Sequence, residues 1–382
     1  MKKMTSRERV RAAAELRPVD RIPVMLWLEP HTLMKIANEV VRPRRMWERR
    51  FFRGLGRLQK TLPTEDLRNA VPLTAFLVQA DFQRELGADI VDFAWGFLPL
   101  WLKGIRVEGR KFFLTDIYGV ERGMGGLYLE ATGYPCKTPE ELERYRFPDL
   151  SHPIHYAHIR LYRMLHPDAA IVCWCPGVQD WSQQWMGMQN LYMWCAEHPE
   201  IIGDFFMRMA EHSLQIIRGA LRAGADIILI GDDYGTQKNL FMSKPMWERL
   251  TYPCLKLQCE GIHRSGGLAL LHSCGSIAPL LDRIVDAGVD MLHPFQPVGD
   301  NDLAAAKAEF GDRLCFVTGI DVQRLPTMAP GEVRESILEN VRIAAPGSGF
   351  VLCPTNFVQE DTPAENLKAM FDTIKEVQNS RF

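Results

Sequence analysis

Two short apolar runs, "ADIILIG" (Ala225–Gly231) and "GLALLHS" (Gly267–Ser273), flank a stretch with the pattern of an amphipathic helix. Short runs rich in aliphatic residues are typical of buried parallel strands, and parallel strands need a crossover connection between them. Apolar runs alternate with stretches of helical pattern in the same way on both sides of this region. The chain is therefore predicted to alternate strands with helices along most of its length.

Eight such strands are predicted. They are Ile22–Trp27, Ala88–Trp95, Ala170–Trp174, Asp226–Ile230, Leu268–Leu271, Val289–Leu292, Leu314–Thr318 and Phe350–Leu352. Eight strand–helix units are what a closed (β/α)8 barrel requires, and the chemistry of such a barrel lies where the strands end. A doubly wound open sheet is the runner-up, but no glycine-rich phosphate turn follows the first run. The predicted fold class is therefore α/β, a TIM barrel.

Residues 1–382 are predicted to form a single barrel domain with two additions. The first is an N-terminal helical extension over residues 1–20, in which Thr5 and Glu8 form a capping box. The second is an insertion over about residues 100–165, between the second and third strands. Its alternating, glycine-rich part, Gly104–Thr132, predicts a β-hairpin.

The composition restricts the class of protein. Of 382 residues, 47% are hydrophobic, the formal net charge is −2, and nine cysteines are scattered without the dense spacing of a disulfide framework. A charge so close to zero gives no case for nucleic acid or an acidic membrane surface, and no apolar run is long enough for a signal peptide or a membrane span. We expect a cytoplasmic protein with reduced thiols, some of which are free to bind a metal.

Three potential metal ligands follow predicted strands. His272 and Cys274 end the fifth strand, and Cys353 ends the eighth. Two thiolates and an imidazole suit a tetrahedral zinc ion with its fourth position left for substrate, water or an exchangeable ligand. Considered singly, each has a simpler explanation, since free cysteines are commonly small buried hydrophobes and strand-end histidines often only hydrogen-bond.

Several segments together resemble the uroporphyrinogen decarboxylase superfamily, over nearly the whole chain. They are "RERVRAAAELRPVDRIPV", "GADIVDFAW", "GADIILIGDDYGTQKNLFMSKPMWERLTYPCLK", "LLHSCGSIAPLLDRIVDAGVDMLHPFQP" and "GFVLCPTNFV". The fold of that superfamily is a (β/α)8 barrel. Its true decarboxylases are metal-free and bind a polyanionic tetrapyrrole through an arginine-bearing motif after the first strand. Here the matching position reads "VMLWLEPHTL", which has no arginine.

A second branch of the superfamily contains zinc-dependent methyltransferases that exchange a methyl group with a corrinoid protein. Their signature is His-x-Cys followed by a distant Cys, and His272, Cys274 and Cys353 match it residue for residue. The resemblance thus implies that these three residues bind zinc. Methionine synthases with a related motif take a fourth ligand, a carboxylate, from the next strand's end. That place here holds His293 and Gln296, so either residue approaches the metal or the position is open to substrate.

Further candidate residues lie at other strand ends. Asp232 and Asp233 follow the fourth strand, where a carboxylate can orient a metal-ligating histidine, contact substrate, or simply cap a turn. Asp232 and His293 are the candidate catalytic residues. The remaining candidates are substrate contacts, and the tryptophans among them suggest flat apolar walls that suit an aromatic ring. They are Trp27, Trp95, Trp181, Gln184, Asp233, Tyr234, Gln296 and Asn356.

The predicted function is zinc-dependent methyl transfer between a methylated substrate and the cobalamin of a separate corrinoid protein. No cobalamin-binding motif (Asp-x-His-x-x-Gly) occurs in the chain, so the corrinoid must come from a partner. The favoured substrate is an aryl methyl ether, which would be O-demethylated, and a small thiol is the second choice. Two competing functions are a decarboxylase related to uroporphyrinogen decarboxylase and a non-catalytic zinc- or corrinoid-binding accessory protein. A homodimer is possible.

Overall fold

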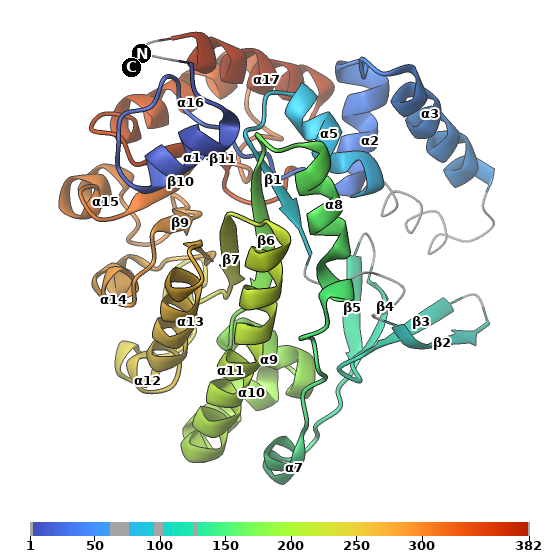
Figure 1. Cartoon of the computed structure of the whole chain (residues 1–382), viewed down its shortest axis with the longest axis vertical. Coiled ribbons are helices and arrows are strands. Elements are labelled where there is room, and N and C mark those ends of the chain that lie inside the picture. Colours follow the sequence, from blue (N-terminus) through green and yellow to red (C-terminus); the bar gives the residue numbers. More distant parts are fainter. Residues whose placement is uncertain (1–2, 62–75, 95–101, 110, 126–127, 381–382) are drawn as a thin grey trace.

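The computed structural model describes residues 3–61, 76–94, 102–109, 111–125 and 128–380. Its centre is a parallel sheet surrounded by helices, as Figure 1 shows. In spatial order the strands are β1 (Ile90–Phe93), β6 (Ala170–Pro176), β7 (Ile227–Gly231), β8 (Leu268–His272), β9 (Met291–His293), β10 (Cys315–Ile320) and β11 (Phe350–Pro354). Spatial order follows chain order, as in a singly wound barrel, and not the reversed order of a doubly wound sheet.

The first predicted strand, Ile22–Trp27, is not a strand of this sheet. Isolated parallel bridges join Val24 to Leu352 of β11 and Met25 to Ile90 of β1. Pro23, near the start of the segment, has no N–H to donate, although its carbonyl accepts from Leu352 N. Because the bridges reach both edge strands, the segment spans the gap between them, and the fold is TIM-barrel-like with seven regular strands.

Helices follow most strands and cover the outside of the sheet (Figure 1). The α-helices are α1 (Ser6–Ala14), α2 (Pro30–Lys35), α3 (Met46–Thr61), α5 (Phe76–Glu85), α7 (Pro139–Arg144), α8 (Ala157–Leu165), α9 (Gln179–Met186), α10 (Met188–Glu197), α11 (Pro199–Ala223), α12 (Lys244–Leu250), α13 (Tyr252–Arg264), α14 (Leu281–Asp286), α15 (Leu303–Phe310), α16 (Pro330–Ala344) and α17 (Ala364–Asn379). A π-helical turn (Ile36–Val40) and two 3-10 turns (Pro153–Tyr156 and Ala278–Leu280) complete them. None of the helices in these described ranges combines the length and apolar composition needed to cross a membrane.

Helix α1 has the predicted capping box, with Thr5 and Glu8 satisfying each other's backbone N–H groups. Its apolar side, which includes Val10 and Ala13, joins the side chains that fill the barrel interior. Arg9 on the same helix is buried and pairs with Asp89, directly before β1, at 2.7 Å. The helix is thus fixed against the end of the barrel where the strands begin, opposite the end expected to carry the chemistry.

The insertion holds more than the single hairpin that was predicted. Four strands, β2 (Leu102–Glu108), β3 (Lys111–Asp116), β4 (Glu121–Gly125) and β5 (Tyr128–Gly133), form an antiparallel sheet in that order. The alternating pattern correctly predicts antiparallel strands, but it underestimates their number. Figure 1 shows this sheet projecting from the parallel one between β1 and α7.

The direction of the side chains on β8 explains where the site lies. Leu268 and Leu270 belong to the apolar cluster inside the barrel, whereas Ala269 and Leu271 belong to the cluster between the strands and the helices. Side chains alternate along a strand, so the next inward position after Leu270 is His272, at the strand's C-terminal end.

The same alternation operates on two further strands. Met291 of β9 and Val351 of β11 are interior residues, so His293 and Cys353, two positions further on, also face inward. Cys353 is itself part of the interior cluster. Three of the predicted site residues therefore lie on the inner wall of the barrel at the end where parallel strands finish.

Candidate metal centre

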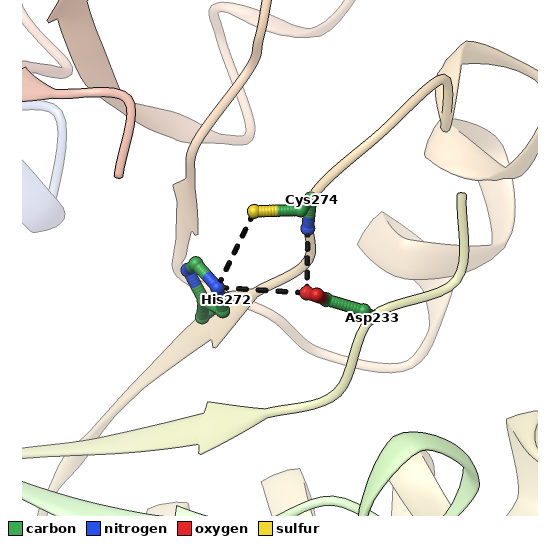
Figure 2. Close-up of side chains that lie close together, drawn as sticks. All are labelled: Asp233, His272 and Cys274. Carbon is green, nitrogen blue, oxygen red and sulfur yellow. Dashed lines mark hydrogen bonds and ion pairs between the residues drawn. The ribbon is translucent and has the colours of Figure 1, made fainter. Parts of the chain in front are cut away.

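Three potential ligand atoms meet at the ends of β7 and β8. His272 Nε2 lies 3.6 Å from Cys274 Sγ and 3.5 Å from Asp233 Oδ1. The ligand atoms of the three residues all lie within 4.8 Å of one another, and Figure 2 shows them facing a common point. An imidazole nitrogen, a thiol sulfur and a carboxylate oxygen are the ligand types that zinc takes in proteins. The donor set therefore fits a zinc ion.

Backbone contacts between the two loops hold these side chains together. Cys274 N donates to Asp233 Oδ1 at 2.8 Å, and Tyr234 N donates to Ser273 Oγ at 3.0 Å. Gly275 has a φ of +88° and lies so close to Gly235 that a Cβ on Gly275 would be 2.2 Å from the Gly235 carbonyl. Only glycine tolerates both the left-handed backbone and this approach. The "SCG" and "DYG" segments thus form one packed unit.

The other ring nitrogen of His272, Nδ1, contacts a second histidine, which is in turn held by a backbone carbonyl. His272 Nδ1 is 2.8 Å from His293 Nδ1, and His293 Nε2 is 2.9 Å from the carbonyl oxygen of Pro354. This chain of contacts runs from the end of β8 through β9 to β11. His293, one of the two candidate catalytic residues, therefore contacts His272 instead of facing the point between His272, Cys274 and Asp233.

Cys353, the third expected ligand, is not a member of the cluster of three ligand atoms. It is fully buried in the barrel interior, one residue before the carbonyl that His293 contacts. The end of β11 nevertheless reaches the cluster, because Asn356 Nδ2 donates to Cys274 Sγ at 3.3 Å. His272 and Cys274 are brought together as expected, Asp233 joins them, and the role of Cys353 stays a prediction.

Burial determines the protonation of these groups. It lowers the pKa of His272 to about 3 and that of His293 well below the ordinary range, the latter helped by the neighbouring His272. Burial also raises the pKa of the Cys274 thiol, with Asp233 adding to the effect, and it raises the pKa of Cys353. The imidazoles are therefore neutral and the thiols protonated. A metal ion would displace a proton from each thiol that it binds.

The place of Asp232 in the sequence suggests that it could orient His272. In the structure its carboxylate has a different role. Its carboxylate accepts the backbone N–H groups of Val178 and Gln179 at 3.0 and 3.2 Å, and that of Asp180 at 2.6 Å. These groups form the start of α9, so Asp232 caps that helix across the barrel wall. Burial raises the pKa of Asp232 to about 7. Asp233, not Asp232, is the carboxylate beside the imidazole.

Aromatic side chains line the barrel beside the cluster. Trp27 stacks on Trp174 and on Phe357 with ring centroids 4.9 and 4.8 Å apart, and its ring lies 4.8 Å from that of His272. A Cβ at Gly231 would lie 3.7 Å from both Trp174 and Trp181, which places both rings at the end of β7. Trp27 is fully buried and Trp181 is partly exposed, and their role as flat walls for a substrate stays a prediction. Trp95 lies outside the described residues.

Three other expected substrate contacts are engaged in holding the structure. Gln184 Oε1 accepts from Arg122 Nη1 at 3.1 Å, which ties α9 to the antiparallel sheet. Gln296 Oε1 accepts from Gly275 N at 2.7 Å. Tyr234 is buried and packs edge-on against Trp247, with ring centroids 5.1 Å apart, on the helix side of the strands. These contacts are internal, and the substrate-binding roles of the three residues stay predictions.

Trp174 and Asp92 also lie here, although the sequence did not single them out as site residues. The neighbours of Trp174 on β6, Cys173 and Cys175, belong to the outer core, whereas its indole also packs against the barrel interior. Trp174 Nε1 donates to Asp92 Oδ2 at 3.2 Å, and burial raises the pKa of Asp92 to about 6. The signal that could have found both residues is their position near the end of a predicted strand.

Known proteins are similar to large parts of this chain. It is 24% identical over 279 residues to the methylcobamide:CoM methyltransferase MtaA of Methanosarcina barkeri (strain Fusaro), covering 70% of this chain and 78% of that protein. It is 28% identical over 186 residues to the uroporphyrinogen decarboxylase of Trichodesmium erythraeum (strain IMS101), covering 47% and 49%. A methyltransferase structure from Methanosarcina mazei superposes with a TM-score of 0.69 at 21% identity, covering 98% of this chain and 99% of that one, which supports the barrel-like fold. Residues 130–377, well over half of the chain, match the family described as uroporphyrinogen decarboxylase (URO-D), and the protein belongs to that family.

Proposed function

We propose that this protein is a zinc-dependent methyltransferase that moves a methyl group between a methylated small molecule and the cobalamin of a separate corrinoid protein. The observation that carries the proposal is the meeting of Asp233, His272 and Cys274 ligand atoms within 4.8 Å at the barrel mouth. The similarity to a methylcobamide:CoM methyltransferase supports it. The true decarboxylases of the superfamily are metal-free, so their reaction does not call for this set of ligand atoms.

His272, Cys274 and either Asp233 or Cys353 would hold the zinc ion. When bound, zinc supplies a Lewis acid that stabilises negative charge on the oxygen or sulfur from which a methyl group departs. Asp233 is fixed by the N–H of Cys274, so its carboxylate needs no large movement to remain beside the metal position. Cys353 would have to turn toward the cluster. These two ligand sets make different predictions for substitution.

The acidic and aromatic surroundings bear on the substrate. Asp92, Asp180 and Asp233 lie around the mouth, and these carboxyl groups supply no positive charge to pair with the polyanionic tetrapyrrole of a decarboxylase. Trp174 and Phe357, both partly exposed and packed on the buried ring of Trp27, offer flat apolar surface instead. We propose an aryl methyl ether as the substrate, with a small thiol as the second candidate. The cytoplasmic location and the homodimer stay predictions.

The first test is the zinc content of the purified wild type and of four variants. The variants are Cys274→Ser, Asp233→Asn, Cys353→Ser and, as a control, Cys195→Ser, whose thiol is buried on α10 in the outer core. We expect about one zinc per chain in the wild type and the control, and loss in Cys274→Ser. Loss in Asp233→Asn or in Cys353→Ser identifies the third ligand.

Methyl transfer is then measured with a reduced corrinoid protein and methoxylated aromatics, by the absorbance change of the cobalt centre. Methylation in the wild type and none in Cys274→Ser supports the proposal. A wild type purified without chelator that holds no zinc would exclude it and return the chain to decarboxylase-like chemistry. Zinc binding and tight association with the corrinoid protein without methyl transfer would instead identify a non-catalytic accessory protein.

A further inference from the structure

Both ring nitrogens of His293 are occupied by neighbours. Nδ1 faces His272 Nδ1 at 2.8 Å, and Nε2 faces the Pro354 carbonyl oxygen at 2.9 Å. The two ring centroids are 5.0 Å apart, with 27° between the ring planes. His293 therefore has no nitrogen left for a metal, although its place in the sequence made it a candidate for the fourth ligand.

The carbonyl determines which nitrogen of His293 carries hydrogen. A carbonyl oxygen only accepts, so His293 Nε2 must be an N–H group. A neutral imidazole has a single N–H, which leaves His293 Nδ1 as an acceptor. Two N–H groups cannot face each other at 2.8 Å, so the hydrogen between the rings belongs to His272 Nδ1. Full burial of His293 excludes the arrangement in which it is a cation with two N–H groups.

The other nitrogen of His272, Nε2, then carries a lone pair, which accepts the S–H of the protonated Cys274 thiol when no metal is bound. Nε2 is the atom that lies 3.6 Å from Cys274 Sγ and 3.5 Å from Asp233 Oδ1. The distance to Asp233 is too long for a good hydrogen bond, so the carboxylate does not compete for a proton on this nitrogen. The lone pair faces the centre of the ligand cluster before any metal is present.

We infer that His293 is a positioning residue which, anchored on the Pro354 carbonyl, holds His272 as the Nδ1–H tautomer with its Nε2 lone pair directed at the metal position. The inference rests on the proposed zinc site but concerns this chain's own residues. The contacts link the ends of β8, β9 and β11, so the carbonyl that ends β11 influences a metal position built on β7 and β8. Outer groups of this kind typically change metal affinity by about 10–100-fold.

The first experiment reads the tautomer directly, without metal. Metal-free protein labelled with 15N-histidine is examined by two-bond 1H–15N correlation spectra, and the His272 signals are assigned by their loss in His272→Gln. We expect a protonated Nδ1 and an unprotonated Nε2 on His272, with the reverse arrangement on His293. A protonated Nε2 on His272 would overturn the inference.

The second experiment compares two variants of similar size, His293→Leu and His293→Asn. Both lose the imidazole ring and the bond to Pro354, but asparagine keeps an acceptor near the position of Nδ1. Zinc affinity, measured by competition with a chromophoric chelator, should fall about 10–100-fold in His293→Leu and recover most of that loss in His293→Asn. Equal affinities in both variants would contradict the positioning role.

The two proposals fail in distinguishable ways. If the wild type binds no zinc, the proposed function fails, whereas the spectra of the metal-free protein still decide the tautomer. If zinc binds and is lost in Cys274→Ser but the tautomer is the opposite one, only the role of His293 fails.

Discussion

Replacing Gly275 with alanine should separate the two loops that carry the ligand atoms. A Cβ at Gly275 would lie 2.2 Å from the carbonyl carbon and oxygen of Gly235 and 2.7 Å from its Cα. These are backbone atoms, so no side-chain rotation relieves the clash. The φ of +88° adds the strain that any Cβ meets in the left-handed region.

A matched control separates strain from clash. Gly266 has a φ of +78°, and a Cβ placed on it would meet nothing within 4 Å. Gly266→Ala should therefore cost only the strain, about 1 kcal/mol. Gly275→Ala should cost the same strain plus overpacking of about 1–3 kcal/mol, for a total of about 2–4 kcal/mol.

The measurement is urea-induced unfolding, followed by both tryptophan fluorescence and circular dichroism so that coincident transitions test two-state behaviour. Zinc affinity is measured on the same preparations. Gly275→Ala should also weaken zinc binding at least about tenfold, because Cys274 moves away from Asp233, while Gly266→Ala should leave it unchanged. If the two variants agree in stability within about 0.5 kcal/mol, the close packing of the loops is refuted.

Three further predictions address residues around the cluster. Asp232→Ala removes the acceptor for three N–H groups at the start of α9 and should lower the free energy of unfolding by about 3 kcal/mol. Because Asp232 caps a helix, the zinc content should not change. Loss of zinc would instead support a role for Asp232 in orienting His272. Burial raises the pKa of Asp92 to about 6, above about 3.9 in an unfolded chain, so the wild type should lose stability as the pH rises from about 4 to 6. The free energy of unfolding of Asp92→Asn, from thermal melts, should therefore match that of the wild type at pH 4 and exceed it at pH 8 by at most about 3 kcal/mol. If the variant and the wild type melt at the same temperature at pH 8 as well as at pH 4, the prediction is wrong. Trp174→Leu should weaken binding of a methoxylated aromatic by roughly threefold to tenfold in calorimetric titrations with zinc retained, and unchanged binding would move the substrate away from this wall.

Much of the fold could be predicted because its signals are local. Buried parallel strands such as β7 and β8 appear as short apolar runs, and the two helices between them, α12 and α13, lie in a stretch with a helical pattern. Seven of the predicted strands are present, with ends displaced by a few residues. Ile22–Trp27 has the same apolar pattern, yet only isolated bridges form there, at Val24 and Met25.

The candidate site divides in a similar way. His272 and Cys274 could be identified from the chain alone because they are two positions apart, at the end of an apolar run, in a motif that resembles a known family. Strand alternation also directs His293 and Cys353 inward. These properties depend only on residues close in sequence or on a recurring motif.

Other features depend on which loops meet, and no local pattern records that. Asp232 and Asp233 are adjacent and chemically identical, yet one caps α9 while the other lies beside His272. Their roles are separated only because β6 and β8 flank β7 on opposite sides, and successive residues at its end turn to different neighbours. The pairing of His272 with His293, and of His293 with the Pro354 carbonyl, likewise requires three strand ends to converge on one barrel mouth. Hydrogen-bond geometry between distant segments is set by tertiary packing, so only the three-dimensional structure assigns these side chains their tasks.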